Sequence, residues 1–198
     1  ASICSEKKIR LTKNDQIYES IQMRFQTFQL VNEKREILDG HQSISIWNSF
    51  MKKNDVFYVS EHRESYGKTK ELKNIVKNNL DIILMPISVT RFSAIKAVSL
   101  LNKLGLKIGI IHLVDLKPFK LKKKWIEAIK SSKYGALMTD NDYNDGILRI
   151  LAHKVNEKTH KRIYVMGLDD KSAGHHLDVD NLPPSAQKIK RKILEIIK

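Results

Sequence analysis

The sequence predicts an α/β protein, a three-layer α/β/α sandwich built on a mostly parallel sheet. From residue 80 onward, short and continuous apolar runs alternate with segments of helical periodicity. Runs that are apolar at every position are typical of strands buried on both faces, as in a parallel sheet covered by helices. Right-handed crossovers between successive strands then place helices on both faces of the sheet.

The predicted strands are short apolar runs of strand length. The first two are DIILMPIS and KIGIIHLVDL, and the third and fourth are GALMTD and KRIYVMGL. Each is followed further along by a segment of helical periodicity, so strand and helix alternate regularly. The four runs cover residues 81–88, 107–116, 135–140 and 161–168.

The predicted helices follow these strands in turn, at 90–105, 121–133, 145–157 and 183–198. In the first, apolar residues recur at three-residue steps and Gly105 is a stop signal. Asp145 is the expected N-cap of the third helix. Pro183 and Pro184 mark the start of the last predicted helix.

Residues 1–66 form a different kind of segment. A helix is predicted over 12–31, a short helix over 41–53, and a strand at Val56–Val59. A helix–strand pair cannot make a core alone, so this segment either packs on the sandwich or is the end of a larger, truncated domain. Residues 67–79 are a lysine-rich connector, and the sandwich itself covers 80–198.

Composition narrows the classes of protein that the chain can belong to. No apolar stretch reaches the roughly 18–20 residues that span a bilayer, and the first residues lack the apolar core of a signal peptide. Cys4 is the single cysteine, which favours a reducing, cytoplasmic setting over a disulfide-bonded secreted one. We therefore expect no membrane partner.

The formal net charge of +14 raises the question of a nucleic-acid partner. The densest basic patch is KPFKLKKKW at 117–125, which has only Phe119 and Trp125 as aromatic neighbours. Lysine rather than arginine supplies most of the charge, and most lysines stand singly on predicted helix faces. We favour a solvated surface, with a basic module that binds nucleic acid or another polyanion as the alternative.

The common catalytic motifs of nucleotide-binding and hydrolytic enzymes are absent from the sequence. Ser88 and Thr90 follow the first predicted strand, where an anion could bind, but without glycines we expect them to cap the helix. TDNDYNDG (139–146) lacks the glutamate of a calcium loop, and GHHLDVD (174–180) has poor metal-ligand spacing, so both are expected to be polar loops. His112 is expected to be a satisfied core histidine rather than a base.

Charged residues follow two of the apolar runs. The strand at 56–59 ends in Glu61, His62 and Arg63, before Tyr66-Gly67. Asp115 ends the second strand of the sandwich, where polar groups are either catalytic or mark a turn. For Glu61, His62 and Arg63, the alternative to a functional role is a surface salt bridge, which contributes little stability.

The order of these elements resembles the carboxyl-terminal domain shared by transketolase and the beta subunits of 2-oxo acid (pyruvate) dehydrogenases. VFYVSEHRESYG (56–67) resembles the last strand of their pyrimidine-binding domain, and 81–119 resembles the first strand, helix and second strand of the carboxyl-terminal domain. ALMTDNDYNDGILRILAHKV and LPPSAQKIKRKILEIIK resemble the later strand–loop–helix and closing helix. The likeness spans about residues 46–198. The sequence departs from the pattern in its short connector and its glycine-poor loop after residue 140.

The resemblance implies a thiamine diphosphate enzyme that uses Mg²⁺, acting as a transketolase-type transferase or a 2-oxo acid dehydrogenase. It implies that His62 or Arg63 contacts an acidic substrate group, with arginine the better clamp. The family's Gly-Asp-Gly motif and activating glutamate find no match here. We therefore expect a homodimer, or a partner that supplies the catalytic domains, and an isolated chain that is inactive and binds no cofactor.

Overall fold

The computed structural model describes residues 72–116, 119–171 and 181–198, all of which belong to one compact unit, Leu72–Lys198. The helices and strand expected within residues 1–66 lie outside the described residues. No helix in the described part of the chain is long and apolar enough to cross a membrane.

The sheet has four strands in the order β2-β1-β3-β4, and all neighbouring pairs are parallel. β1 spans Ile82–Pro86, β2 Ile108–Ile110, β3 Ala136–Tyr143 and β4 Ile163–Leu168. The central strands β1 and β3 are joined in register from Ile83 opposite Ala136 to Pro86 opposite Thr139. Every residue of β1 is buried, as the continuous apolar run predicts for a strand covered on both faces.

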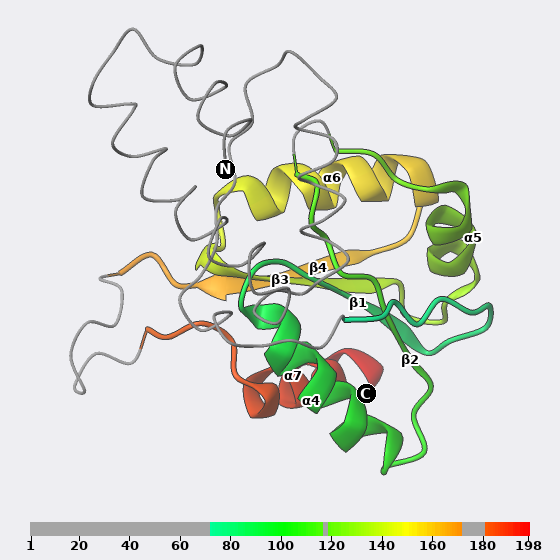
Figure 1. The fold of residues 1–198 in the computed structure, drawn as a ribbon, viewed down its shortest axis with the longest axis horizontal. Helices are drawn as coiled ribbons and strands as arrows, with labels where there is room; N and C mark the ends of the chain where they lie inside the picture. The colour runs from blue at the N-terminus through cyan, green and yellow to red at the C-terminus, as the bar shows by residue number, and fades with distance from the viewer. Residues whose placement is uncertain (1–71, 117–118, 172–180) are drawn as a thin grey trace, which may run out of the picture. The chain divides into compact units, whose positions relative to one another are not determined.

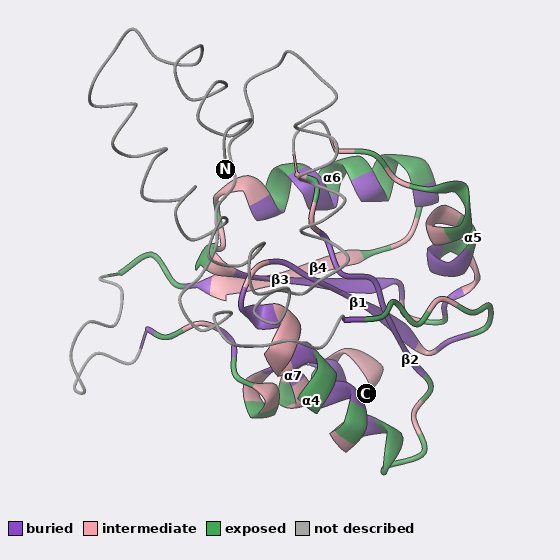
Figure 2. Ribbon diagram, viewed as in Figure 1, coloured by how far each residue is buried: buried purple, intermediate pink, exposed green. Residues whose placement is uncertain are grey.

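Helices cover both faces of the sheet, as Figure 1 shows. α4 (Thr90–Asn102) and α7 (Ala186–Ile197) lie on one face, and α5 (Lys123–Ser131) and α6 (Ile147–Thr159) lie on the other. The buried side of each helix faces the sheet (Figure 2). The predicted three-layer α/β/α sandwich is therefore confirmed, and its sheet is entirely parallel.

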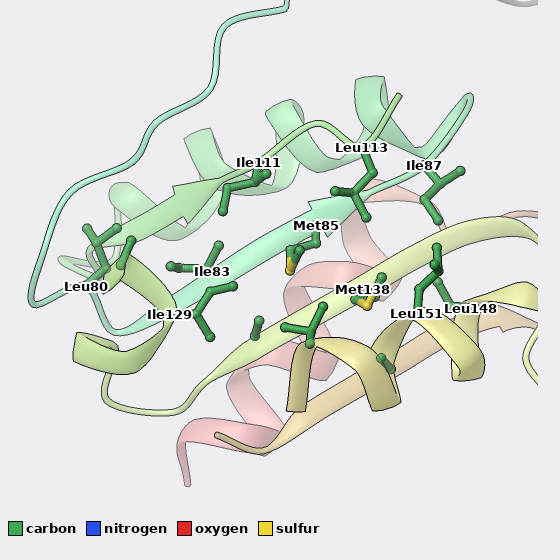
Figure 3. Packing of buried hydrophobic residues seen from close by; sticks show 14 residues of the cluster. Leu80, Ile83, Met85, Ile87, Ile111, Leu113, Ile129, Met138, Leu148 and Leu151 are labelled. Atoms are coloured by element: carbon green, nitrogen blue, oxygen red, sulfur yellow. The ribbon is translucent and has the colours of Figure 1, made fainter. Parts of the chain in front are cut away.

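Two hydrophobic clusters fill the spaces between the layers. Alternate residues of β1 enter opposite clusters: Ile83 and Met85 pack with α5 and α6, whereas Ile82 and Leu84 pack with α4 and α7. Figure 3 shows the first cluster, where Met85 and Met138 lie between the strands and the leucines of α6. This alternation is the period-two pattern of a strand with two buried faces.

The second predicted strand, 107–116, is too long. β2 ends at Ile110, whose outer edge pairs antiparallel with Ile75. Beyond β2, the N–H groups of Ile111 and Leu113 still donate to the carbonyls of Leu84 and Pro86, at 2.8 and 3.0 Å. The N–H of His112 donates to Asn74 Oδ1 at 2.7 Å. Leu113 returns to an isolated parallel bridge with Ile87. β3 is longer than predicted, reaching Tyr143 through a register shift.

The predicted N-cap of α6 is wrong. Gly146 occupies the N-cap position without a side-chain cap, and the carboxylate of Asp145 instead accepts a hydrogen bond from Arg149 Nε one turn along. In α7 the prolines precede the helix, and Ser185 is the N-cap, accepting from the Lys188 N–H at 3.3 Å.

Candidate functional site

The carboxyl ends of β1 and β3 form the point at which the chain connections diverge. The connection after β1 leads to α4 on one face, and the connection after β3 leads to α6 on the other. In open α/β sheets, ligands bind outside the strand carboxyl ends at such a switch point. The polar residues at this point are therefore the candidate site of the described unit.

Thr90 and Thr139 join the two sides of the switch point. Thr139 Oγ1 donates to Thr90 Oγ1 at 3.0 Å, and Thr90 Oγ1 donates to the carbonyl of Ile87 at 2.6 Å. The Ile87 N–H donates in turn to the carbonyl of Thr139 at 2.8 Å. Both threonines are buried. This closed network holds the ends of β1 and β3 together.

The expectation that Ser88 and Thr90 cap α4 is wrong. The N-cap residue is Val89, which has helical dihedrals and no side-chain cap hydrogen bond. The Thr90 hydroxyl is hydrogen-bonded to the Ile87 carbonyl and to the Thr139 hydroxyl. Ser88 adopts a left-handed conformation with φ 51°. A non-glycine residue in this region costs about 1 kcal/mol or more, so the turn after β1 is strained.

Asp140 is a buried carboxyl at the end of the regular part of β3, with only 4% of its surface exposed. The Asn141 N–H donates to Asp140 Oδ1 at 2.7 Å. Burial raises the pKa of Asp140 from 3.8 to about 6, with a smaller contribution from the charge of Asp142. Asp140 can therefore bind and release a proton near pH 6. The TDNDYNDG segment, expected to be a polar loop, continues β3 as far as Tyr143 before the turn at 144–146. Sequence reasoning did not identify Asp140.

His112 lies one residue beyond Ile111 and is 2% exposed. Its burial was predicted, but the expectation of a satisfied side chain is wrong: neither ring nitrogen has a hydrogen-bond partner of good geometry among the described residues. Burial first, and then the charge of Arg91, lower the pKa of His112 to about 3, against a small opposing effect of the Lys73 backbone. The imidazole is therefore neutral at physiological pH and is a buried donor and acceptor.

The residues proposed from the sequence as a site are not brought together by the described unit. Glu61, His62 and Arg63 lie outside the described residues. Asp115 is described and is exposed, and its role stays a prediction.

Across 72–116, 119–171 and 181–198, no three histidine, cysteine or acidic side chains come close enough to hold a metal ion. The GHHLDVD segment lies outside the described residues.

Comparison with known proteins identifies the fold. No family model matches the chain, and no curated protein matches it. A solved structure described as a split-gene transketolase, an inactive beta4 tetramer, superposes with a TM-score of 0.60 at 15% identity, over 81% of this chain and 55% of that one. The chain thus spans about half the length of this match.

Two further solved structures give TM-scores of 0.48. One is a 2-oxoglutarate:ferredoxin oxidoreductase from Magnetococcus marinus, at 13% identity over 79% of this chain and 22% of that one. The other is a Pichia stipitis transketolase mutant in complex with xylulose 5-phosphate, at 12% identity over 82% of this chain and 24% of that one. At such identities the first match shows a shared transketolase-type fold and nothing finer. The likeness to dehydrogenase beta subunits stays a prediction.

Proposed function

We propose that this chain is a carboxyl-terminal assembly and substrate-channel domain of a transketolase- or 2-oxo acid dehydrogenase-type thiamine diphosphate enzyme, incomplete for catalysis by itself. The observation that carries the proposal is the all-parallel sheet of order β2-β1-β3-β4, covered on both faces, that superposes on a split-gene transketolase. That protein is described as inactive in its beta4 form. A chain of this fold is thus known in an assembled but inactive state.

In such an enzyme thiamine diphosphate supplies an electron sink for the reaction of a 2-oxo acid or ketose. The pyrimidine-activating carboxylate and the Mg²⁺ ligands would come from a partner or from further domains. This chain would contribute Arg63 or His62 to bind the acidic group of the substrate, and the sandwich to hold the assembly together. Arg63 is the better choice, because a guanidinium binds a carboxylate or phosphate through two parallel hydrogen bonds.

The assembly surface that we propose is the outer edge of β4 with the residues around Asn181. β4 is the last strand of the sheet, and none of the described residues pairs with its second edge. Asn181 Oδ1 accepts from the Asp169 N–H at 2.9 Å, and its Nδ2 donates to the carbonyl of Lys171 at 2.8 Å. These bonds fix the chain on both sides of residues 172–180. Leu182 follows with 55% of its surface exposed.

Light scattering on the full chain tests this proposal. We expect a dimer or larger oligomer at concentrations of tens of micromolar, or co-elution with a polypeptide that carries Gly-Asp-Gly and an activating glutamate and is encoded beside this chain. Leu182→Asp should weaken that assembly. Ile150→Asp on α6 is the matched control, because Ile150 is also 55% exposed. A monomer that binds no such polypeptide, or equal effects of both substitutions, would contradict the proposal.

A further inference from the structure

The amino ends of the strands carry a row of cations. Lys107 precedes β2, Lys133 precedes β3, and Lys161 and Arg162 precede β4. Backbone hydrogen bonds join neighbouring starts: Asp81 N–H donates to the carbonyl of Lys107 at 2.8 Å, and Ala136 N–H donates to that of Arg162 at 3.2 Å. With strands about 4.8 Å apart, the row crosses the sheet over roughly 14 Å.

Helix ends add to this row. α4, α5 and α6 run back antiparallel to the strands, so Lys103, Lys130 and Lys158 fall at the same edge. We call these seven residues the basic edge: Lys103, Lys107, Lys130, Lys133, Lys158, Lys161 and Arg162. Six are exposed, and Lys161 is half-buried with its Nζ bonded to the carbonyl of Ser132 at 2.8 Å.

Carboxylates near the basic edge are fewer than its cations. Asp81 Oδ2 accepts the Lys107 N–H at 2.7 Å. Glu157 contacts His153 at 3.3 Å, and Glu195 on α7 contacts Lys192 at 3.5 Å. The seven cations of the basic edge outnumber these three carboxylates, so the edge has an excess of positive charge.

The opposite end of the sheet, where the strands finish, carries both signs of charge. Its exposed acidic residues are Asp115, Asp142, Asp169 and Asp170, and the exposed lysines at the start of α5 are Lys122, Lys123 and Lys124.

Two tyrosines contact cations of the basic edge. Lys133 Nζ is 4.9 Å from the ring centre of Tyr134, and Arg162 Cζ is 4.9 Å from that of Tyr164. Both rings are half-buried and pack against the cluster on the α4 and α7 face. These cation–π contacts hold two cations close to aromatic surface. Cations combined with aromatic rings are what proteins use to bind the phosphates and bases of single-stranded nucleic acid.

We propose that the basic edge binds a single-stranded nucleic acid through its phosphate backbone. This site differs from the 117–125 patch that the sequence suggested. The described lysines of that patch lie at or before the start of α5, at the opposite end of the helix from Lys130. Among them, Lys122 Nζ lies 5.1 Å from the ring centre of Trp125. The inference is independent of the thiamine enzyme proposal, because it rests on charge and topology alone.

Fluorescence anisotropy with the full chain and a labelled oligouridine tests the site across a range of salt concentrations. Changing Lys133→Gln and Arg162→Gln together should weaken binding about tenfold at low salt, and should reduce the slope of log K against log salt by about 1.4, since each lost phosphate contact contributes about 0.7. Both side chains are exposed, so the variant should keep its thermal midpoint. A second pair, Lys103→Gln with Lys107→Gln, should weaken binding in the same direction.

The matched control removes the same charge from the other patch, as Lys123→Gln with Lys124→Gln at the start of α5. At about 0.1–0.15 M salt it should change the affinity by less than about threefold, because charges beyond the roughly 8–10 Å Debye length are then screened. Equal loss in the control pair would overturn the site, as would no binding by the unmodified chain at low salt. Competition by oligoglutamate as effective as that by unlabelled RNA would overturn the assignment to nucleic acid, and would indicate an acidic protein partner.

Discussion

Thr139 Oγ1 lies 3.0 Å from Thr90 Oγ1 and donates a hydrogen bond to it across the carboxyl ends of the two central strands. Because valine has nearly the shape of threonine, substitution at either position removes the hydroxyl without opening a cavity. Thr139→Val should lower the free energy of unfolding by about 1 kcal/mol. Thr90→Val should cost more, about 1–3 kcal/mol, since it leaves the buried Thr139 hydroxyl without its acceptor.

The double variant distinguishes a coupled pair from two independent bonds. With both hydroxyls removed, no unpartnered donor remains, so adding Thr139→Val to Thr90→Val should be nearly neutral. Urea denaturation of the four proteins gives the coupling energy. Thr159→Val is the control, because Thr159 bonds to the carbonyl of Val155 in its own helix and should be additive with Thr139→Val. Additive effects of the central pair would contradict the network.

Asp140 makes the unit less stable as the pH rises. Its folded pKa of about 6 lies above its ordinary value of 3.8, so the folded state binds the proton more tightly than the unfolded state. The stability that protonation provides is present below pH 3.8 and is lost as the pH rises toward about 6. The full shift corresponds to roughly 3 kcal/mol. Asp140→Asn should therefore raise the unfolding free energy above that of the unmodified chain, and this gain should be larger at pH 7 than at pH 4.

Thermal or urea unfolding at several pH values measures the effect of Asp140→Asn. Loss of the bond from the Asn141 N–H offsets part of the gain, so the expected increase at pH 7 is about 1–2 kcal/mol. Asp142→Asn is the control, since Asp142 is exposed and its change should shift stability by no more than about 0.5 kcal/mol. A variant that is less stable than the unmodified chain at pH 7 would show that the carboxylate is stabilised by its surroundings.

His112 acts in the opposite direction. Its folded pKa of about 3 lies below the ordinary 6.5, so the unfolded state takes up the proton first as the pH falls. Stability is lost progressively from about pH 6.5 downward. His112→Leu removes this loss and fills the position with an apolar side chain. The variant should gain about 2 kcal/mol over the unmodified chain between pH 7 and pH 5. An unchanged difference across this range would contradict a neutral buried imidazole.

Gly135 is required by a close backbone approach. It has φ +79°, and a Cβ atom there would lie 2.1 Å from the carbonyl oxygen of Arg162. Gly135→Ala should destabilise the fold by about 3 kcal/mol or more, because the two backbones must separate. Gly105→Ala is the matched control: Gly105 has φ +81° but no atom within 4 Å of such a Cβ, so only the roughly 1–2 kcal/mol of left-handed strain applies. Equal decreases in the thermal midpoint for both variants would contradict a steric requirement for glycine at position 135.

Periodicity was sufficient to predict the sandwich. Strands buried on both faces and amphipathic helices leave local signals, and β1, α4 and α6 begin within two residues of the predicted positions. The errors lie at element ends, where the decisive contacts are distant in sequence. The outer edge of the segment around β2, for example, is occupied by Ile75, which pairs with Ile110, and by Asn74, which binds the His112 N–H. A local sequence pattern does not indicate a hydrogen-bond partner that lies more than 30 residues away in the sequence.

The candidate site was harder to predict for the same reason. Thr90 and Thr139 are 49 residues apart, so their hydrogen bond depends on strand order rather than on any motif. Asp140 ends a buried strand, and the only available signal was an acidic residue directly after an apolar run. The basic edge is likewise a product of topology, since Lys107, Lys133 and Arg162 stand apart in the sequence and meet only when the strands align.

Calorimetric titration of the full chain with thiamine diphosphate and Mg²⁺ tests the central claim of an incomplete enzyme domain. Cofactor activation needs a carboxylate at the pyrimidine ring and a metal-anchored diphosphate, and the described residues offer no cluster that could hold the metal. We expect no saturable heat with the chain alone, and binding once a polypeptide carrying Gly-Asp-Gly and the activating glutamate is added. Micromolar binding by the chain alone would contradict the account and would locate the missing site within its own residues.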